Sequence, residues 1–248
     1  MIPIRDDNPT QHTPVVTYAL IGLNVLSWVL VQQMGAGREF LASVVQFGLI
    51  PGELLGTVAP GTTVEVARGV GYEIGESGNW HTLVTHMFMH GGWLHLIGNM
   101  WFLMIFGNNV EEAMGSVRFA GFYLLGGLVA AGAQVATAPA AAVPMVGASG
   151  AIGAVMGGYA LLFPLVGVEM LVFLGFFITT VVVPAFLMLG YWFFLQILTG
   201  VSGASGNVAV WSHAGGFVTG FVLVKVFARA DRLKELSRRR RSRRWRRA

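Results

Sequence analysis

The chain has 248 residues, of which 54% are hydrophobic and only 11% are charged. Soluble domains average about 25% charged residues, so this composition excludes an ordinary soluble fold and indicates a membrane protein. The absence of cysteine excludes disulfides, thiolate nucleophiles and cysteine metal ligands. A nucleophile must therefore be Ser, Thr, Lys or a carboxylate, and a bound metal would need His and Glu.

Apolar segments long enough to cross a bilayer recur along the chain. A hydrocarbon core about 30 Å thick needs roughly 20 apolar residues per helix. The first such segment has a long apolar run and a weakly basic flank, so it is interpreted as an anchor rather than a signal peptide. The sequence predicts an all-α polytopic bundle with six transmembrane helices, near 14–34, 93–113, 116–137, 148–163, 184–200 and 208–228.

The segments between these spans differ in character. Residues 1–13 form a short N-terminal segment, and residues 35–80 are acidic and rich in turn formers, which predicts a long external loop. Residues 168–183 are apolar but β-branched and end before Pro184, so they are expected to lie at the membrane interface rather than to extend the fifth span. The intramembrane domain is therefore predicted over 14–228.

Charge is concentrated at the C-terminus. Residues 225–248 contain twelve Lys/Arg and two acids, a net charge of +10, whereas the rest of the chain carries −6. Basic flanks stay on the cytoplasmic side, so the polybasic tail at 229–248 is predicted to be cytoplasmic, and six spans place the N-terminus there too. Anionic lipid headgroups are a sufficient partner for this tail, and no nucleic-acid partner is expected.

Polar residues gather at one depth of the predicted bundle. Spans two, four and six run from outside to inside, and near their outer ends lie His90, His95, Asn99, Ser149 and His213. The fourth span has about 16 residues between its bounding prolines and rises about 24 Å, less than the bilayer core. Its first residues are therefore predicted to lie several Å inside the membrane, at the foot of a recess.

Two stripes of small residues accompany this serine and this histidine. Ser149, Gly153 and Gly157 share one helical face, and His213, Gly216 and Gly220 share another. Small faces let helix backbones approach closely in lipid. An isolated serine in a span more often serves packing and bonds to its own helix. A histidine at matching depth favours a Ser–His contact instead, because intramembrane ionisable residues are costly and usually functional.

A serine beside a histidine predicts nucleophilic catalysis, with the serine hydroxyl as the attacking group. A serine hydroxyl needs a base within hydrogen-bond reach, and His213 is the only candidate on the sixth span. The aspartates lie outside the hydrophobic body, and Glu111 and Glu112 lie about 24 Å further along the second span than His95. The prediction is therefore a Ser149–His213 dyad without a third acid, and the group that orients His213 is not predicted.

Stabilisation of an oxyanion needs donors placed in advance. His95 and Asn99 are spaced i and i+4 on one helical face. The backbone N–H groups over 147–149 begin a helix, where they are unpaired and have the helix dipole behind them. Together these groups form a candidate oxyanion hole.

A metal site is the competing hypothesis. Four of the six histidines, His81, His86, His90 and His95, lie within 15 residues. The sequence has no H-E-x-x-H motif and no carboxylate between residues 77 and 110, and zinc hydrolase sites usually recruit one. Metal transport or metal-assisted hydrolysis is therefore the less favoured hypothesis and no cofactor is expected. His81 and His86 are interpreted as loop-packing residues.

Three motifs resemble those of the rhomboid intramembrane serine proteases: "HGGWLHLIGNMWFLMIFGNNVEEAMGSVRF", "GASGAIGAVMGGY" and "WSHAGGF". The resemblance runs from about Trp80 to Phe227. It implies a six-helix bundle whose acyl-transfer site lies in a water-filled cavity open to the outer face. It also implies that Ser149 is the nucleophile, that His213 is the base, and that His95, Asn99 and the Ser149 backbone amide stabilise the oxyanion. Supporting positions implied by the motifs are His90, Gly147, Gly150, Gly216, Gly220, Glu111, Gly115 and Arg118.

The resemblance further implies a substrate class, which is the transmembrane helix of a single-pass membrane protein, cut near the outer face. Such a helix must unwind before cleavage, and Gly, Ala, Ser or Pro near the scissile bond favours unwinding. The implied location is a prokaryotic inner membrane, and the gate is either the fifth span or the loop at 35–80. A non-catalytic rhomboid-like protein that binds membrane helices is the remaining alternative.

The chain departs from the family pattern at two places. Family members often carry Trp-Arg where this chain has Trp80-His81. Some have a tyrosine four residues after the nucleophile, stacking on the base, where this chain has Gly153. These departures leave open how the external loop is anchored and how His213 is supported.

Overall fold

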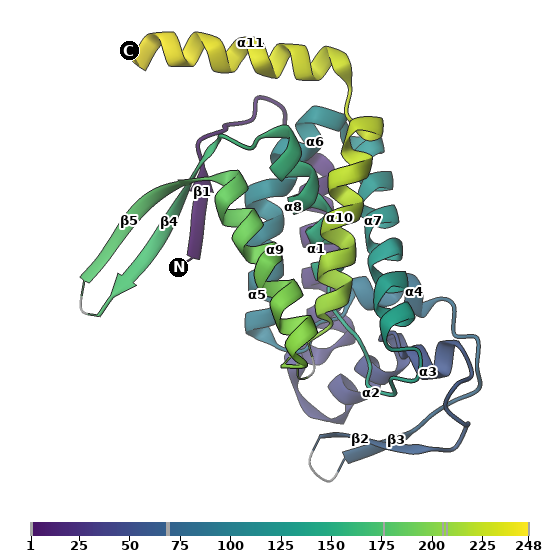
Figure 1. Ribbon diagram of the computed structural model, residues 1–248. Helices are drawn as coiled ribbons and strands as arrows, with labels where there is room; N and C mark the ends of the chain where they lie inside the picture. The colour runs from purple at the N-terminus through teal and green to yellow at the C-terminus, as the bar shows by residue number, and fades with distance from the viewer. Residues whose placement is uncertain (1, 68–69, 176, 205, 207, 248) are drawn as a thin grey trace.

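The computed structural model describes residues 2–67, 70–175, 177–204, 206 and 208–247. The helices of the central bundle run along a common direction, the C-terminal helix crosses one end of the bundle, and small β-elements lie at the other end and at one side (Figure 1). The longest helices are α7 (Ser116–Thr137), α9 (Ala185–Ser202), α10 (Val210–Phe227) and α11 (Ala230–Arg247). The other elements of the bundle are α1 (Val15–Leu26) with a π-helical turn over Ser27–Val31, α5 (Trp93–Phe102), a second π-helical turn over Leu103–Gly107, α6 (Asn108–Met114) and α8 (Ser149–Leu162).

Apolar helices dominate the described part of the chain. Three of them, α7, α9 and α10, are long and apolar enough to cross a membrane. Two shorter apolar helical stretches cover Val15–Val31 and Ser149–Leu162. These elements coincide with predicted spans, and α7 has the predicted bounds. The chain is therefore a helical integral membrane protein.

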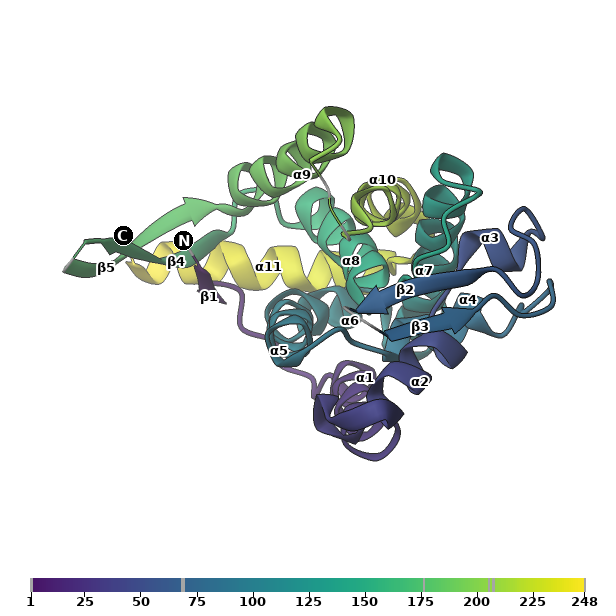
Figure 2. The ribbon, with the colours of Figure 1, turned by 90° about the horizontal axis from the view of Figure 1, so that it is seen from below.

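Helix α8 occupies the middle of the bundle. Figure 2 shows it with α5, α7, α9 and α10 arranged around it. Its residues from Gly150 to Ala160 are all buried. Its partner α10 lies so close that a Cβ atom added at Gly157 would collide with the carbonyl oxygen of Phe217. A Cβ atom at Gly216 would likewise collide with the carbonyl oxygen of Gly150. The predicted close packing of these glycine faces is present.

The predicted external loop contains regular structure. It holds α2 (Gly37–Phe47), the short helix α3 (Pro51–Leu54) and a hairpin of β2 (Thr63–Ala67) and β3 (Val70–Glu73), followed by α4 (Thr82–Thr85) and a 3-10 turn over His86–Phe88. Residues 68 and 69 lie outside the described residues. The hairpin is tied back to the bundle by the Tyr72 hydroxyl, which donates a hydrogen bond to the carbonyl of Ala142. Burial, reinforced by Glu53, raises the pKa of Tyr72 to about 12, so this hydroxyl keeps its donor proton.

The segment at 168–183 is a β-hairpin, not a helical extension of the fifth span. Strands β4 (Gly167–Leu174) and β5 (Phe177–Pro184) pair antiparallel, and β1 (Ile2–Asp6) adds a third strand on the other edge of β4. Helix α9 begins only after Pro184. The hairpin projects sideways from the bundle (Figures 1 and 2). Residue 176, at its turn, lies outside the described residues.

A buried carboxylate ties two helix starts together. Glu111, in α6, accepts hydrogen bonds from the N–H groups of Val16 (3.0 Å) and Thr17 (2.8 Å) at the start of α1. It also accepts the hydroxyl of Thr17 at 2.8 Å and that of Ser116, at the start of α7, at 2.7 Å. Free N–H groups in the first turn of a helix are satisfied in this way, and the carboxylate also matches the helix dipole.

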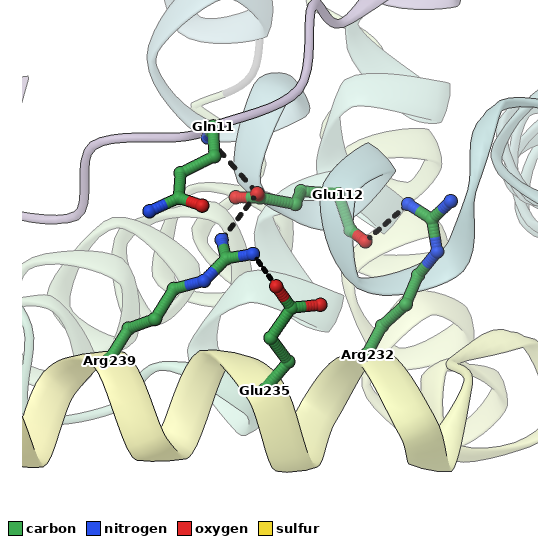
Figure 3. A network of polar contacts seen from close by, with 5 residues as sticks. All are labelled: Gln11, Glu112, Arg232, Glu235 and Arg239. Atoms are coloured by element: carbon green, nitrogen blue, oxygen red, sulfur yellow. Dashed lines mark hydrogen bonds and ion pairs between the residues drawn. The ribbon is translucent and has the colours of Figure 1, made fainter.

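The neighbouring Glu112 holds the C-terminal helix. Its carboxylate accepts the N–H of Gln11 and the guanidinium of Arg239, both at 3.0 Å, and its carbonyl accepts Arg232 at 3.0 Å (Figure 3). Glu235 pairs with Arg239 on the same helix. The predicted tail is thus helix α11, lying across the end of the bundle (Figure 1). Residue 248 lies outside the described residues.

Loss of the Glu111 carboxylate is expected to destabilise the fold. Glu111→Ala leaves four donors at two helix starts without their acceptor, and a loss of roughly 2–5 kcal/mol in the free energy of unfolding follows. Thermal unfolding in detergent measures it. Glu76→Ala, at an exposed carboxylate between β3 and α4, is the matched control and should unfold like the wild type. Equal midpoints for the two variants would contradict the anchoring role.

Candidate active site

Ser149 and His213 lie in contact. Ser149 is the first residue of α8, and His213 lies in the first turn of α10. The Nε2 atom of His213 is 2.7 Å from the Oγ atom of Ser149, which is hydrogen-bond distance. The close approach of the two glycine faces brings these helix starts together. The geometry is that of a hydroxyl beside a base able to take its proton.

The segment between α1 and α5 fixes the turn before Ser149. Met145 exchanges two backbone hydrogen bonds with Leu49, at 2.9 and 2.8 Å. Gly147 donates its N–H to the carbonyl of His86 at 2.9 Å and has a φ of +130°, which side-chain-bearing residues rarely adopt. The start of α8 is therefore positioned by contacts from outside the bundle.

The second nitrogen of His213 also has a partner. Its Nδ1 atom lies 2.8 Å from the Oε1 atom of Gln196, on α9. An amide oxygen only accepts hydrogen bonds, so Nδ1 carries the proton of the neutral ring. Nε2 is then unprotonated and accepts the hydroxyl proton of Ser149. This is the tautomer that a general base at this serine requires.

Gln196 is the site residue that the sequence reasoning missed. A carboxylate is the usual orienting partner of a catalytic histidine, whereas this group is a neutral amide. A signal was present, because Gln196 is the one amide side chain in the apolar helix at 185–202. Polar residues inside spanning helices usually face the bundle and take part in function.

An aromatic ring lies beside His213 even though Gly153 replaces the expected tyrosine. A Cβ atom at Gly153 would lie 2.9 Å from the carbonyl oxygen of His213 itself, so α8 has no room for a larger residue there. The indole of Trp192, one turn before Gln196 on α9, lies 5.9 Å from the imidazole, centroid to centroid, with a tilt of 35°. The neighbouring aromatic ring thus comes from α9.

His95 lies next to the serine across Gly147. A Cβ atom added to Gly147 would lie 2.8 Å from the Nε2 atom of His95 and 3.5 Å from the Oγ atom of Ser149. The Nδ1 atom of His95 accepts the N–H of Gly91 at 3.2 Å, so Nε2 carries the proton and faces the same space as the serine. Asn99 is one helical turn further along, and its amide donates to the carbonyl of His95 at 3.0 Å.

In the structure, His81 and His86 make separate contacts, whereas His90 and His95 stay together. His86 Nδ1 lies 2.7 Å from the carbonyl of Thr82, and the exposed His81 lies 3.4 Å from the carbonyl of Gln46. His90 is fully buried, with its ring edge-on to His95 at 5.2 Å. Within the described residues, no three His, Asp or Glu side chains come together as metal ligands.

The remaining motif positions act in packing. The main chain of His90 is held by Gln32, whose side chain accepts its N–H at 2.7 Å and donates to its carbonyl at 2.8 Å. Gly150, Gly216 and Gly220 line the contact between α8 and α10. Arg118 reaches the carbonyl of Phe227 at 3.4 Å, and Gly115 adopts a φ of +82° between α6 and α7. None of these contacts involves the Ser149 or His213 side chains.

Comparison with known proteins gives the class. The model of the rhomboid domain matches residues 77–230, which is more than half of the chain and contains the whole Ser–His site. The chain therefore belongs to the rhomboid family.

Named relatives share parts of this domain. The putative rhomboid protease YdcA of Bacillus subtilis is 34% identical over 90 residues, which is 36% of this chain and 45% of YdcA. Two Arabidopsis thaliana proteins also match. RHOMBOID-like protein 5 is 34% identical over 33% of this chain and 26% of its own length. Rhomboid-like protein 11, chloroplastic, is 42% identical over 29% of this chain and 26% of its own length. The matches thus span less than half the length of each relative.

Proposed function

We propose that this protein is an intramembrane serine endopeptidase of the rhomboid type. The observation that carries the proposal is the Ser149–His213 contact at 2.7 Å, with the far nitrogen of the imidazole bound to Gln196. The family membership and the name of the B. subtilis relative support the same reaction class.

The reaction follows from the arrangement. His213 takes the hydroxyl proton as the Ser149 oxygen attacks the scissile carbonyl carbon. The resulting oxyanion is stabilised by the Ser149 N–H at the start of α8 and by the Nε2–H of His95, with Asn99 as a further donor. His213 then gives its proton to the leaving amine, and water hydrolyses the acyl-serine through the same base.

The substrate class in this proposal is the transmembrane helix of a single-pass membrane protein, cut near the outer face. Six spans place both termini on the cytoplasmic side of a prokaryotic inner membrane. The grouping of the start of α1 with α6 and α11 at one end, and of the β2–β3 hairpin at the other, supports this topology (Figure 1). The basic residues of α11 then face anionic lipid headgroups.

One assay tests the function. Purified protein in detergent is incubated with a fluorogenic spanning peptide that carries Gly and Ala near its outer end, with and without EDTA. We expect wild-type cleavage that resists EDTA and is lost in Ser149→Ala, because only the hydroxyl is removed. Ser202→Ala, an exposed serine at the end of α9, is the control and should cleave normally.

Other outcomes select the alternatives. Loss of activity with EDTA would favour the metal hypothesis. Full activity of Ser149→Ala would mean that Ser149 serves only in helix packing. A folded wild type that cleaves none of a broad peptide panel would favour a rhomboid-like protein that binds membrane helices without cutting them.

A further inference from the structure

The partner of His213 comes from the helix with the least support in the bundle. Only 11% of the apolar stretch of α9 is buried inside the protein, compared with 39% for α7 and for α10. Its outward side chains include Phe186, Tyr191 and Phe194, which are exposed and can only face lipid. Gln196 is half-buried, and its amide oxygen is 2.8 Å from the imidazole.

We propose that Gln196 is the positioning residue of this site, so that the base is correctly oriented only while α9 is docked against α10. The inference rests on the proposed function. In serine hydrolases with a triad, an acidic residue orients the histidine and balances its charge. Here that place is taken by a neutral amide, which fixes the tautomer and the ring orientation without supplying a negative charge.

The sequence leaves no carboxylate for this role. Neither the stretch at 113–168 nor the stretch at 170–230 contains Asp or Glu, and together they hold α7 to α10. Glu169 lies on β4 and pairs with Arg5 at 2.5 Å, outside the spanning helices. Burial of an amide in a spanning helix is costly unless it is hydrogen-bonded, and the imidazole of His213 supplies that bond.

The position of α9 and the orientation of the base are therefore linked. Trp192 and Gln196 are one turn apart on the same face of α9, and both lie against His213. Displacement of α9 removes the hydrogen bond and the aromatic neighbour together. A substrate helix that moves α9 aside would meet a serine whose base is free to rotate. Catalysis then follows only after α9 has returned.

The test uses the full-length protein with replacements at Gln196. Gln196→Met keeps the length of the side chain and suits an apolar helix but has no acceptor for Nδ1–H. We expect its kcat to fall by roughly 10- to 100-fold, because a misplaced catalytic group costs on this order, while KM stays near the wild-type value. Thermal unfolding of the same samples shows that the helices remain packed.

Gln196→Glu allows a measurement that a loss of packing alone would not change, namely the pH–rate profile. It restores the acceptor and adds a negative charge beside the imidazole, which favours the protonated ring. We expect activity above that of Gln196→Met, with the acidic limb of the pH–rate profile displaced toward higher pH. Gln134→Met is the matched control, since the Gln134 oxygen accepts the backbone N–H of Ser212 at 3.3 Å and does not contact the His213 ring.

The outcomes separate this inference from the proposed function. An inactive wild type would remove the proposed function itself. An active wild type with unchanged kcat and pH profile in both Gln196 variants would overturn the positioning role alone. An equal fall in Gln196→Met and Gln134→Met, with no displaced profile in Gln196→Glu, would also overturn it, because the effect would then be general packing.

Discussion

Replacement of His213 by alanine is expected to lower peptide cleavage by at least about a thousand-fold, because Ser149 loses the base that lies 2.7 Å from its hydroxyl. Truncation also frees the amide of Gln196, yet the glycine contacts between α8 and α10 persist, so the fold is retained. Cleavage of the fluorogenic peptide measures the loss. Covalent labelling of Ser149 by a fluorophosphonate should fall with it, because that reaction uses the same activated hydroxyl.

His81→Ala is the control for this variant. His81 is exposed, and its ring lies 3.4 Å from the carbonyl of Gln46, in α2. Its cleavage rate should match the wild type. A His213→Ala protein that still cuts at the wild-type rate, while folded, would refute the dyad.

Replacement of Gly220 by alanine is expected to destabilise the fold by forcing α8 and α10 apart. An added Cβ atom would overlap the carbonyl oxygen of Ala154 and lie 2.6 Å from its Cα atom. Both are backbone atoms, so no side-chain rotation relieves the collision and the two helices must separate. Overpacking of this kind costs about 3 kcal/mol, and it also widens the gap that Ser149 and His213 bridge. A lower midpoint of thermal unfolding and weakened cleavage should therefore appear together.

Gly190→Ala is the matched comparison. Gly190 lies within α9, and a Cβ atom there would meet no atom within 4 Å. Alanine has the higher helix propensity, so this variant should unfold at or slightly above the wild-type midpoint. If Gly220→Ala were as stable as Gly190→Ala, the close backbone contact between α8 and α10 would be wrong.

Several features of the site could be predicted from the sequence because they depend on local pattern. Hydropathy alone set the bounds of α7, and the spacing of Ser149, His213 and the glycines on two helices implied a close contact between them. These features follow the period of a single helix, so they can be predicted without knowing how each helix is rotated about its own axis.

Gln196 could not be assigned in the same way. The contact depends on the rotation of α9 about its own axis, and an apolar helix in lipid carries little amphipathic pattern to fix that rotation. The tyrosine that some family members carry four residues after the nucleophile has no counterpart, because steric crowding between α8 and α10 leaves that place to glycine. Trp192 fills the role from a helix that the motif does not include.

The hairpin at 167–184 was obscured by its hydropathy. A window long enough to find spans merges β4 and β5 into one apolar run, although Gly175 interrupts it with a φ of +63°. Pairing of β4 with β1 is a contact between distant parts of the chain, which no local pattern specifies.

That pairing has a consequence for biosynthesis. Ile2 pairs with Leu171, and Gln11 shares Glu112 with Arg239. During synthesis β1 cannot complete its sheet until β4 has followed α8 out of the ribosome, and Arg239 reaches Glu112 only after α11 has been made. A protein truncated after α10 should therefore keep the pairing of β1 with β4 and the Gln11 contact, and lose only the two arginine contacts that join α11 to Glu112.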